Sequence, residues 1–233
     1  MALKNNTWKL NQWYDQNVAG NVEYIGPRLL YTTGYNDSGE LGQNIPGGSS
    51  RSSPVQLAGT NWKLVDSDLR ADGYIGAIKT DGTLWAWGRN ENGELGLNDR
   101  TYQSSPTQIP GTTWSVVTTV GRQSGMVATK TDGTLWSWGK NVKGNLGQNN
   151  ATKYSSPVQI PGTPSWKSVR SNYDARHVLA TKTDGTLWGW GFCNDGNLEL
   201  NNRNEYSSPV QIPGGYVSAM TGTTGVTAFI KVQ

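Results

Sequence analysis

The side chains able to carry catalysis or hold a metal ion are few in this 233-residue chain. It has one histidine, His177, and one cysteine, Cys193, in the same stretch of sequence. A cysteine next to a histidine can form an activated thiolate, so a Cys-His pair is one catalytic hypothesis. A zinc or copper site needs further histidines or a cysteine cluster, and the chain has neither. We therefore expect no metal and no other cofactor.

The acidic residues fit turns better than a catalytic carboxylate pair. Three aspartates recur, and each directly precedes a glycine: Asp81, Asp132 and Asp184. Glu40 and Glu94 lie in the sequence GELG, whereas the later copies of this run carry Asn145 and Asn197. An acid that changes to asparagine without loss of the motif indicates a structural or solvated position. The acids in NDSGE and NENGE lack the 12-residue ligand pattern of a calcium loop.

Composition and charge exclude several further classes of function. The net charge is +3, and no run of Lys or Arg occurs among the 20 basic residues, so neither a nucleic-acid tail nor a membrane-surface patch is expected. Residues 1–20 contain no apolar core segment, which argues against a conventional signal peptide, and no stretch is long enough to span a membrane. The glycine-rich runs lack the GxxxxGKS pattern that cradles phosphate.

The elements that must position these residues follow from an internal repeat. Its clearest marker is the glycine that closes a Trp-x-Trp-Gly segment, at Gly88, Gly139 and Gly191, with an eroded copy at Gly34. A Ser-Ser-Pro sequence recurs at about the same period, and so does an aromatic residue that opens an apolar run: Pro54, Pro106, Pro157 and Pro209; Trp8, Trp62, Trp114, Trp166 and Tyr216. We predict one domain over 1–233, with units at about 1–59, 60–111, 112–162 and 163–214 and a half unit at 215–233.

Each unit is predicted to form four short strands. In the fourth unit these are 166–169, 177–183, 186–191 and the SSPVQIP segment, with Asp184-Gly185 as the hairpin turn between the second and third strands. Trp136 and Trp138 should point to one face of a strand. The glycine-rich run after them should be a crossover whose leucine plugs the core and whose asparagine bonds nearby backbone. Repeated four-stranded units predict an all-β fold, a β-propeller.

These residues resemble the RCC1-repeat family, the regulator of chromosome condensation propellers, in bacterial or viral form. The matching segments are DGTLWAWGRNENGELG, DGTLWSWGKNVKGNLG and DGTLWGWGFCNDGNLE, each followed by a Ser-Ser-Pro segment. The resemblance implies a propeller, usually of seven blades, that serves as a platform for protein partners. Four full blades and a partial fifth cannot form seven, so we expect either a small closed ring or an arc completed by neighbouring chains.

Departures from the family pattern bear on function. GPRLLYTTG replaces DGTLWxWG in the first unit, and the fourth unit has Cys193 for the motif Asn and Glu199 for the second Gly. His177 takes a strand position that Tyr74 and Gly125 hold in other units, which favours a structural role for it. There is no basic N-terminal tail and no wedge-like insertion, so nucleotide exchange on a small GTPase is not expected.

Recognition residues are expected where the copies differ, because loops carry binding. Two sets of variable loops are rich in the arginine and tyrosine that interfaces favour, and the N-terminal segment adds extra aromatic residues. The alternative is that these loops are solvated and have drifted. The candidate interface residues are Trp13, Tyr14, Arg70, Arg122, Arg170, Arg176, Tyr102, Tyr154 and Tyr206.

The sequence favours a non-enzymatic interaction or structural protein. Our leading hypothesis is a component of a bacteriophage or other viral particle (decoration, capsid or tail) that binds other virion proteins, with further copies of itself as a second partner to test. One alternative is a soluble bacterial protein-binding or enzyme-inhibitor propeller, and another is a carbohydrate-binding propeller. No specific nucleic acid and no membrane are expected as partners. The expected location is the virion, and otherwise the cytoplasm or the extracellular space.

Overall fold

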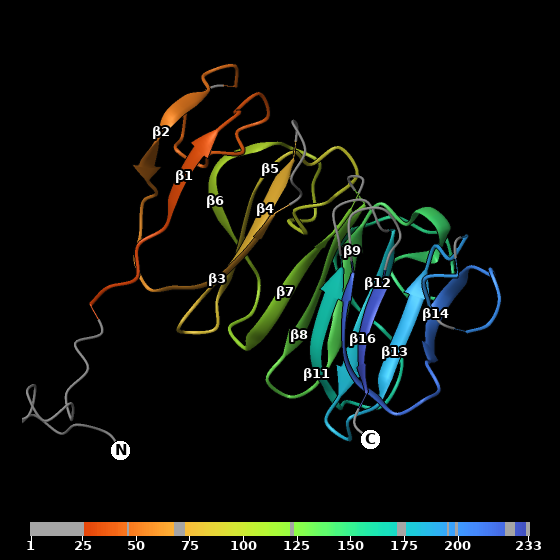
Figure 1. Ribbon diagram of the computed structural model, residues 1–233. Helices are drawn as coiled ribbons and strands as arrows, with labels where there is room; N and C mark the ends of the chain where they lie inside the picture. Colours follow the sequence, from red (N-terminus) through yellow and green to blue (C-terminus); the bar gives the residue numbers. More distant parts are fainter. Residues whose placement is uncertain are drawn as a thin grey trace, which may run out of the picture.

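The computed structural model describes residues 26–45, 47–67, 73–121, 124–171, 176–194, 196–198, 200–221 and 227–231, with side chains as far as residue 215. Within these residues the chain forms sixteen strands and one short 3-10 helix, Val142–Gly144 (Figure 1). The predicted all-β fold is confirmed. No helix in the described part has the length and apolar character needed to cross a bilayer.

Three complete four-stranded antiparallel sheets form the body of the molecule, and we call them blades 1, 2 and 3. Blade 1 consists of β3 (Trp62–Ser67), β4 (Tyr74–Lys79), β5 (Leu84–Gly88) and β6 (Gln103–Ile109). Blade 2 consists of β7 (Trp114–Val120), β8 (Gly125–Lys130), β9 (Leu135–Gly139) and β10 (Tyr154–Gln159). Blade 3 consists of β11 (Trp166–Ser171), β12 (His177–Lys182), β13 (Leu187–Gly191) and β14 (Tyr206–Gln211). The strands of each blade follow one another in chain order, as the four-strand prediction requires.

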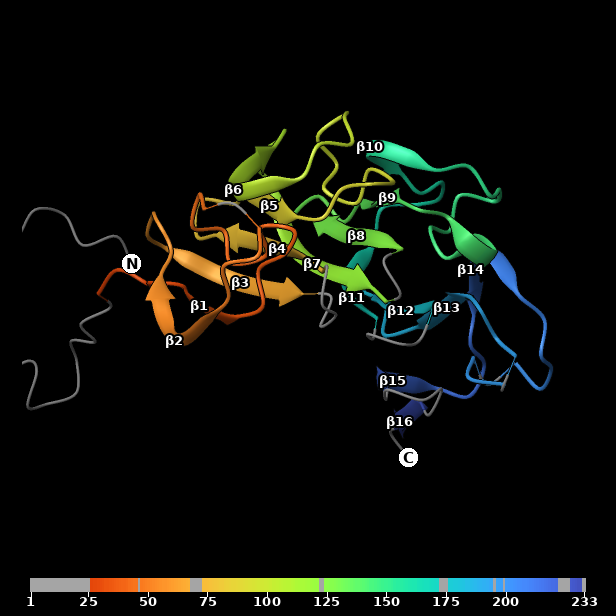
Figure 2. The same ribbon diagram turned by 90° about the horizontal axis from the view of Figure 1, so that it is seen from above.

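Two half-blades lie at opposite ends of an arc formed by the three blades (Figure 2). The N-terminal half-blade pairs β1 (Tyr31–Gly34) with β2 (Arg51–Gln56). The C-terminal half-blade pairs β15 (Tyr216–Thr221) with β16 (Thr227–Lys231). The first strand expected from Trp8 lies outside the described residues. In the described part the sheets form an open arc, and β16 does not pair with β1.

The hairpin between the second and third strands of each blade is closed by the recurring Asp-Gly pair. Asp132 Oδ1 accepts hydrogen bonds from Thr134 N (2.9 Å) and from Thr134 Oγ1 (2.7 Å). Thr134 Oγ1 in turn accepts the indole N–H of Trp136 at 2.8 Å. The same chain of contacts recurs at Asp81 and Asp184. These bonds to Thr134 lower the pKa of Asp132, so the aspartates are ionised acceptors within turns.

Tryptophans join each blade to the one before it. Trp138, which is fully buried on β9 of blade 2, donates its Nε1–H to the carbonyl of Glu94 in blade 1 at 2.9 Å. Trp136 and Trp138 both lie edge-on to Trp114, so the two indoles share a face as predicted. Lys130 Nζ lies 4.0 Å from the Trp136 ring centroid, a cation–π contact. The equivalent indole bonds are Trp87 to Glu40 and Trp190 to Asn145.

The glycine-rich crossovers fit against the same indoles. Leu95 is fully buried, and its N–H donates to Asn90 Oδ1 at 2.9 Å, so the predicted plug and asparagine bond are both confirmed in blade 1. Gly96 follows with φ +69°, and a Cβ there would lie 2.7 Å from Trp138 Nε1. Glycine is therefore required at Gly96 both by backbone conformation and by close approach.

Glu94 is buried and structural, not solvated. Its carboxylate accepts the backbone N–H of Asn92 at 2.7 Å and the Asn92 side-chain amide at 2.8 Å. Glu40 repeats the first of these contacts by accepting Ser38 N at 2.8 Å. The asparagines in the later copies occupy equally buried positions in the crossover. Of the two sequence-based readings of this position, the structural one is correct.

Candidate functional site

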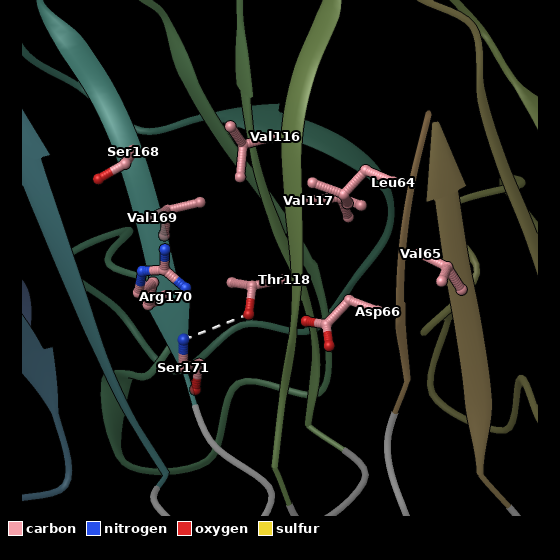
Figure 3. Close-up of a pocket in the computed structure, with 10 residues that line it drawn as sticks. All are labelled: Leu64, Val65, Asp66, Val116, Val117, Thr118, Ser168, Val169, Arg170 and Ser171. Carbon is pink, nitrogen blue, oxygen red and sulfur yellow. Dashed lines mark hydrogen bonds between the residues drawn. The ribbon is translucent and has the colours of Figure 1, made fainter. Parts of the chain in front are cut away.

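The inner strands of the three blades line a groove of about 460 Å³ on one side of the arc (Figure 3). Each blade contributes consecutive residues from the centre of its first strand, which is the strand on the inner side of the arc. The lining residues are Leu64, Val65, Asp66, Val116, Val117, Thr118, Ser168, Val169, Arg170 and Ser171. The groove thus combines apolar side chains with one acid and one base.

The same repeat position differs in chemistry from blade to blade. Asp66, Thr118 and Arg170 are spaced at 52 residues and lie at corresponding points of β3, β7 and β11. The strand of Thr118 lies between those of Asp66 and Arg170 in Figure 3. Val65, beside Asp66, is 48% exposed although it is a β-branched apolar residue. The groove therefore carries an acid beside an exposed valine at one edge and an arginine at the other, with Thr118 between the two charged residues (Figure 3).

Two of these polar residues also join adjacent blades. Asp66 Oδ2 accepts Thr119 N from blade 2 at 2.8 Å, and Thr118 Oγ1 accepts Ser171 N from blade 3 at 3.2 Å. Burial raises the pKa of Asp66 and outweighs the opposing effect of its hydrogen bonds, of which that from Thr119 N is the largest. Arg170 is exposed and takes the same position on β11. Its charge is therefore available to a molecule in the groove.

The Cys-His hypothesis finds no support in the geometry. His177 is fully buried at the start of β12, where Tyr74 and Gly125 begin β4 and β8. Neither of its ring nitrogens has a hydrogen-bond partner among the described residues, and burial lowers its pKa to about 4. The Cys193 thiol instead makes a weak 3.8 Å contact with the carbonyl of Asn202. Within the described residues no group of three or more metal-ligating side chains is found.

The predicted interface residues do not form one surface. Arg170 lies in the groove, whereas Arg176 precedes β12 and its guanidinium is 6.0 Å from the Phe192 ring. The three tyrosines lie at the outermost strands, across each blade from the groove: Tyr154 and Tyr206 begin β10 and β14, and Tyr102 directly precedes β6. Four further candidates fall outside the described residues: Trp13, Tyr14, Arg70 and Arg122.

The three tyrosines make contacts within the chain. Tyr102 is 41% exposed and donates its hydroxyl to Glu91 at 2.8 Å; Glu91 also forms an ion pair with Arg89. Tyr154 and Tyr206 are half-buried and accept side-chain amide hydrogen bonds from their own loops, from Asn150 and Asn202, both at 2.9 Å. Of these tyrosines, Tyr102 therefore has the most surface left for a partner.

Sequence reasoning missed the apolar and acidic part of the groove. Of the groove residues, only Arg170 is among the candidates named from the sequence; Val65, Asp66 and Val116 are not. A signal for the groove is present in the sequence. In a propeller the first strand of each blade faces the central axis, so residues at the same position of the first strands border one shared space. Comparison of Asp66, Thr118 and Arg170 across the copies would have found the site.

The repeated antiparallel blades and the inner groove define a β-propeller-type repeat protein. A family model described as "Regulator of chromosome condensation (RCC1) repeat" matches residues 81–127 and 132–180. Human protein RCC2 is 32% identical over 176 residues, which cover 73% of this chain and 32% of that protein. The chain belongs to the RCC1-repeat family.

Further relatives agree with this assignment. The ultraviolet-B receptor UVR8 of Arabidopsis thaliana is 27% identical over 183 residues, or 77% of this chain and 40% of the receptor. The chain thus spans less than half the length of these curated relatives. Yeast RCC1 (Prp20), solved bound to Kap60, matches with a TM-score of 0.70 and 17% identity, covering 88% of this chain and 51% of that one. Human WBSCR16 matches with a TM-score of 0.68 and 22% identity, and the match covers 81% of this chain and 49% of that one. These structural likenesses show the fold.

Proposed function

We propose that this chain is a non-enzymatic interaction module that binds a segment of another protein in the inner groove. The observation that carries the proposal is a groove with apolar lining residues, in which the exposed Val65 and Asp66 lie at one edge and Arg170 at the other (Figure 3). Exposed apolar surface bordered by charge is typical of protein interaction sites. The proteins that resemble it include yeast RCC1 solved bound to Kap60, which agrees with such a role.

The proposal is tested by placing a photo-crosslinking amino acid at Val65 of the full chain in its source cells. The matched control carries the same group at Gln108, which is exposed on the outer strand β6. We expect a partner protein to be crosslinked from position 65 and not from position 108, and the crosslink to be lost when Val116→Asp is added. Equal crosslinking from both positions, or crosslinking from position 108 alone, would refute the groove as the binding surface.

We further propose that the partner is a virion protein and that the chain is a decoration, capsid or tail component. The support for this is that its TDGTLWxWG repeats resemble bacterial and viral members of the family and that its sequence is rich in Gly, Asn and Thr. The curated relatives named above are eukaryotic and supply no argument for it. Mass spectrometry of purified particles tests the proposal: the chain should be present in fixed ratio to the capsid protein. Its absence from particles, with a soluble enzyme crosslinked at Val65, would favour the inhibitor alternative.

A further inference from the structure

One position of the inner strands serves the junction between blades in two copies of the repeat and not in the third. Asp66 Oδ2 accepts the N–H of Thr119 at 2.8 Å, and Thr118 Oγ1 accepts the N–H of Ser171 at 3.2 Å. Each bond runs from the fifth residue of one inner strand to the sixth residue of the next. In blades 1 and 2 this position is therefore a structural acceptor.

Arg170 holds the same position in blade 3 and cannot accept a hydrogen bond. Its guanidinium has five N–H donors and no acceptor atom. The sixth residue of the next inner strand, β15, is Thr221, and the side chain of Arg170 offers no acceptor for the backbone N–H there. A role in the junction therefore does not account for an arginine at this position.

The acid of the groove is committed to the protein. Asp66 Oδ1 accepts the N–H of Ser67 at 3.0 Å, so each of its carboxylate oxygens has a backbone donor. The side chains of Thr118 and Thr119 hydrogen-bond to the same carboxylate. Burial is the largest effect on the pKa of Asp66 and raises it. A cationic group on a ligand would therefore find this acid already occupied.

The two serines that line the groove are bonded as well. Ser168 Oγ shares a hydrogen bond with Thr181 Oγ1 at 2.6 Å, and Ser171 Oγ donates to the carbonyl of His177 at 2.8 Å. Among the described lining residues, Arg170 is then the one polar side chain with neither a hydrogen bond nor an ion pair. Because it is exposed, a ligand can bond it without breaking a contact within the chain.

The rest of the lining is aliphatic and partly open to solvent. Val65 is 48% exposed and Val116 is half-buried, whereas Val117 and Val169 are buried. The groove thus offers one uncommitted cation and an aliphatic surface. A ligand that matches both has one anionic group and one aliphatic group.

We propose that the segment bound in the groove carries an aspartate or glutamate whose carboxylate pairs with Arg170, and an aliphatic side chain that packs on Val65. This inference rests on the groove being the binding surface, as proposed above. A guanidinium holds a carboxylate through two parallel N–H···O bonds, which a neutral acceptor such as threonine cannot do. The pairing gives the arginine of the third copy a role that the junction does not.

The arrangement of the blades sets the spacing of these two anchors. Val65 lies on β3 and Arg170 on β11, with β7 of blade 2 between them (Figure 3). Packed sheets lie about 10 Å apart, so the two strands are separated by at most about 20 Å. An extended chain rises about 3.3 Å per residue, so the acid should lie within about six positions of the aliphatic residue.

Peptide selection on the full chain tests the proposal. The probe is a library of random dodecapeptides displayed on phage, and the immobilised chain is either unmodified or carries Arg170→Glu. The matched control is Arg203→Glu, which makes the same change of charge at an exposed residue outside the groove. The unmodified chain should enrich peptides with an acid within about six positions of an aliphatic residue, and Arg170→Glu should lose them.

Synthetic copies of the enriched peptides then give dissociation constants by fluorescence polarisation. Arg170→Glu should raise the dissociation constant by about tenfold or more, because a charge-assisted hydrogen bond is lost, and Arg203→Glu by less than about twofold. Exchange of the peptide's acid for lysine should restore binding to Arg170→Glu and weaken binding to the unmodified chain. Misfolding of the variant could not produce this reciprocal rescue.

The same measurements separate a failure of the pairing from a failure of the groove. Peptides that lose binding with Val65→Asn but show no preference for an acid would overturn the pairing with Arg170 and leave the groove as the binding surface. Equal weakening by Arg170→Glu and Arg203→Glu would do the same. A selection in which no peptide is sensitive to Val65→Asn or to Arg170→Glu would overturn both proposals.

Discussion

Replacement of Gly96 by alanine tests whether the blades are held apart at a fixed distance by the indole contact. The new Cβ would lie 2.7 Å from Trp138 Nε1 and 3.0 Å from its Cδ1. Trp138 cannot move away freely, because it is fully buried and its Nε1–H is bonded to Glu94 O at 2.9 Å. The substitution therefore adds a steric cost to the cost of a positive φ.

The two costs can be separated with a second glycine. Gly185 has φ +83°, and a Cβ there would meet nothing within 4 Å among the described atoms. Gly185→Ala should lower the free energy of unfolding by about 1–2 kcal/mol, the cost of left-handed backbone for an L-residue. Gly96→Ala carries this same strain plus ~1–3 kcal/mol for over-packing, so about 2–5 kcal/mol is expected.

Urea unfolding followed by tryptophan fluorescence measures both variants, and unchanged m-values would show that the compared states are the same. Adding Trp138→Phe to Gly96→Ala should cost less than the sum of the two single changes, because the ring that meets the new methyl group becomes smaller. Equal destabilisation by Gly96→Ala and Gly185→Ala, or strict additivity with Trp138→Phe, would refute the close-contact argument.

Three further predictions concern buried polar positions. His177 has a pKa of about 4 in the fold against 6.5 when unfolded, so folding favours its neutral form. The free energy of unfolding should therefore fall by up to about 3 kcal/mol as the pH drops from 6.5 to 4. His177→Tyr should lose this pH dependence, and parallel pH–stability curves for the two proteins would contradict the prediction. In the unmodified chain Gly125 N donates a hydrogen bond to the Tyr74 hydroxyl at 2.9 Å, and Tyr74→Phe removes this acceptor. The free energy of unfolding, measured by chemical denaturation, should fall by about 1–3 kcal/mol. An unchanged denaturation midpoint would argue against the bond. Cys193→Asn restores the motif residue whose equivalent in blade 1, Asn90, bonds three backbone groups, and should raise the thermal midpoint. A lowered midpoint would show that the crossover of blade 3 has diverged.

Much of a single blade could be predicted from the sequence because its determinants are local. Asp132-Gly133 sets the hairpin, and the two-residue spacing of Trp136 and Trp138 sets the face, without reference to the rest of the chain. The groove could not be predicted in the same way. Val65 and Arg170 come together only because inner strands of different blades line one space, which depends on the arc's curvature.

The tyrosine hypothesis shows a second limit. Tyr154 and Tyr206 look like interface residues when only residue type and loop position are considered. Each has an asparagine four residues earlier that bonds its hydroxyl, and this local pairing is visible in the sequence as N-x-x-x-Y. The spacing by itself does not show whether the bond forms, so the structure is needed to tell which tyrosine closes its own loop. Tyr102 also follows an asparagine at that spacing, Asn98, but its hydroxyl donates to Glu91 instead.

The contacts between blades have a consequence for how such chains change length. Each junction uses the same set: an indole to a crossover carbonyl, a crossover N–H to a serine carbonyl, and a glycine against each. Duplication of 112–162 would place a blade-2 crossover against a blade-2 fourth strand, where Asn149 meets Ser155 in place of Ser207 and Gly147 meets Trp138 in place of Trp190. Within this set every new neighbour is of the same type as the old one, so gain or loss of a whole unit keeps these crossover contacts matched. The number of blades can therefore vary among relatives by recombination between copies, without accompanying point mutations.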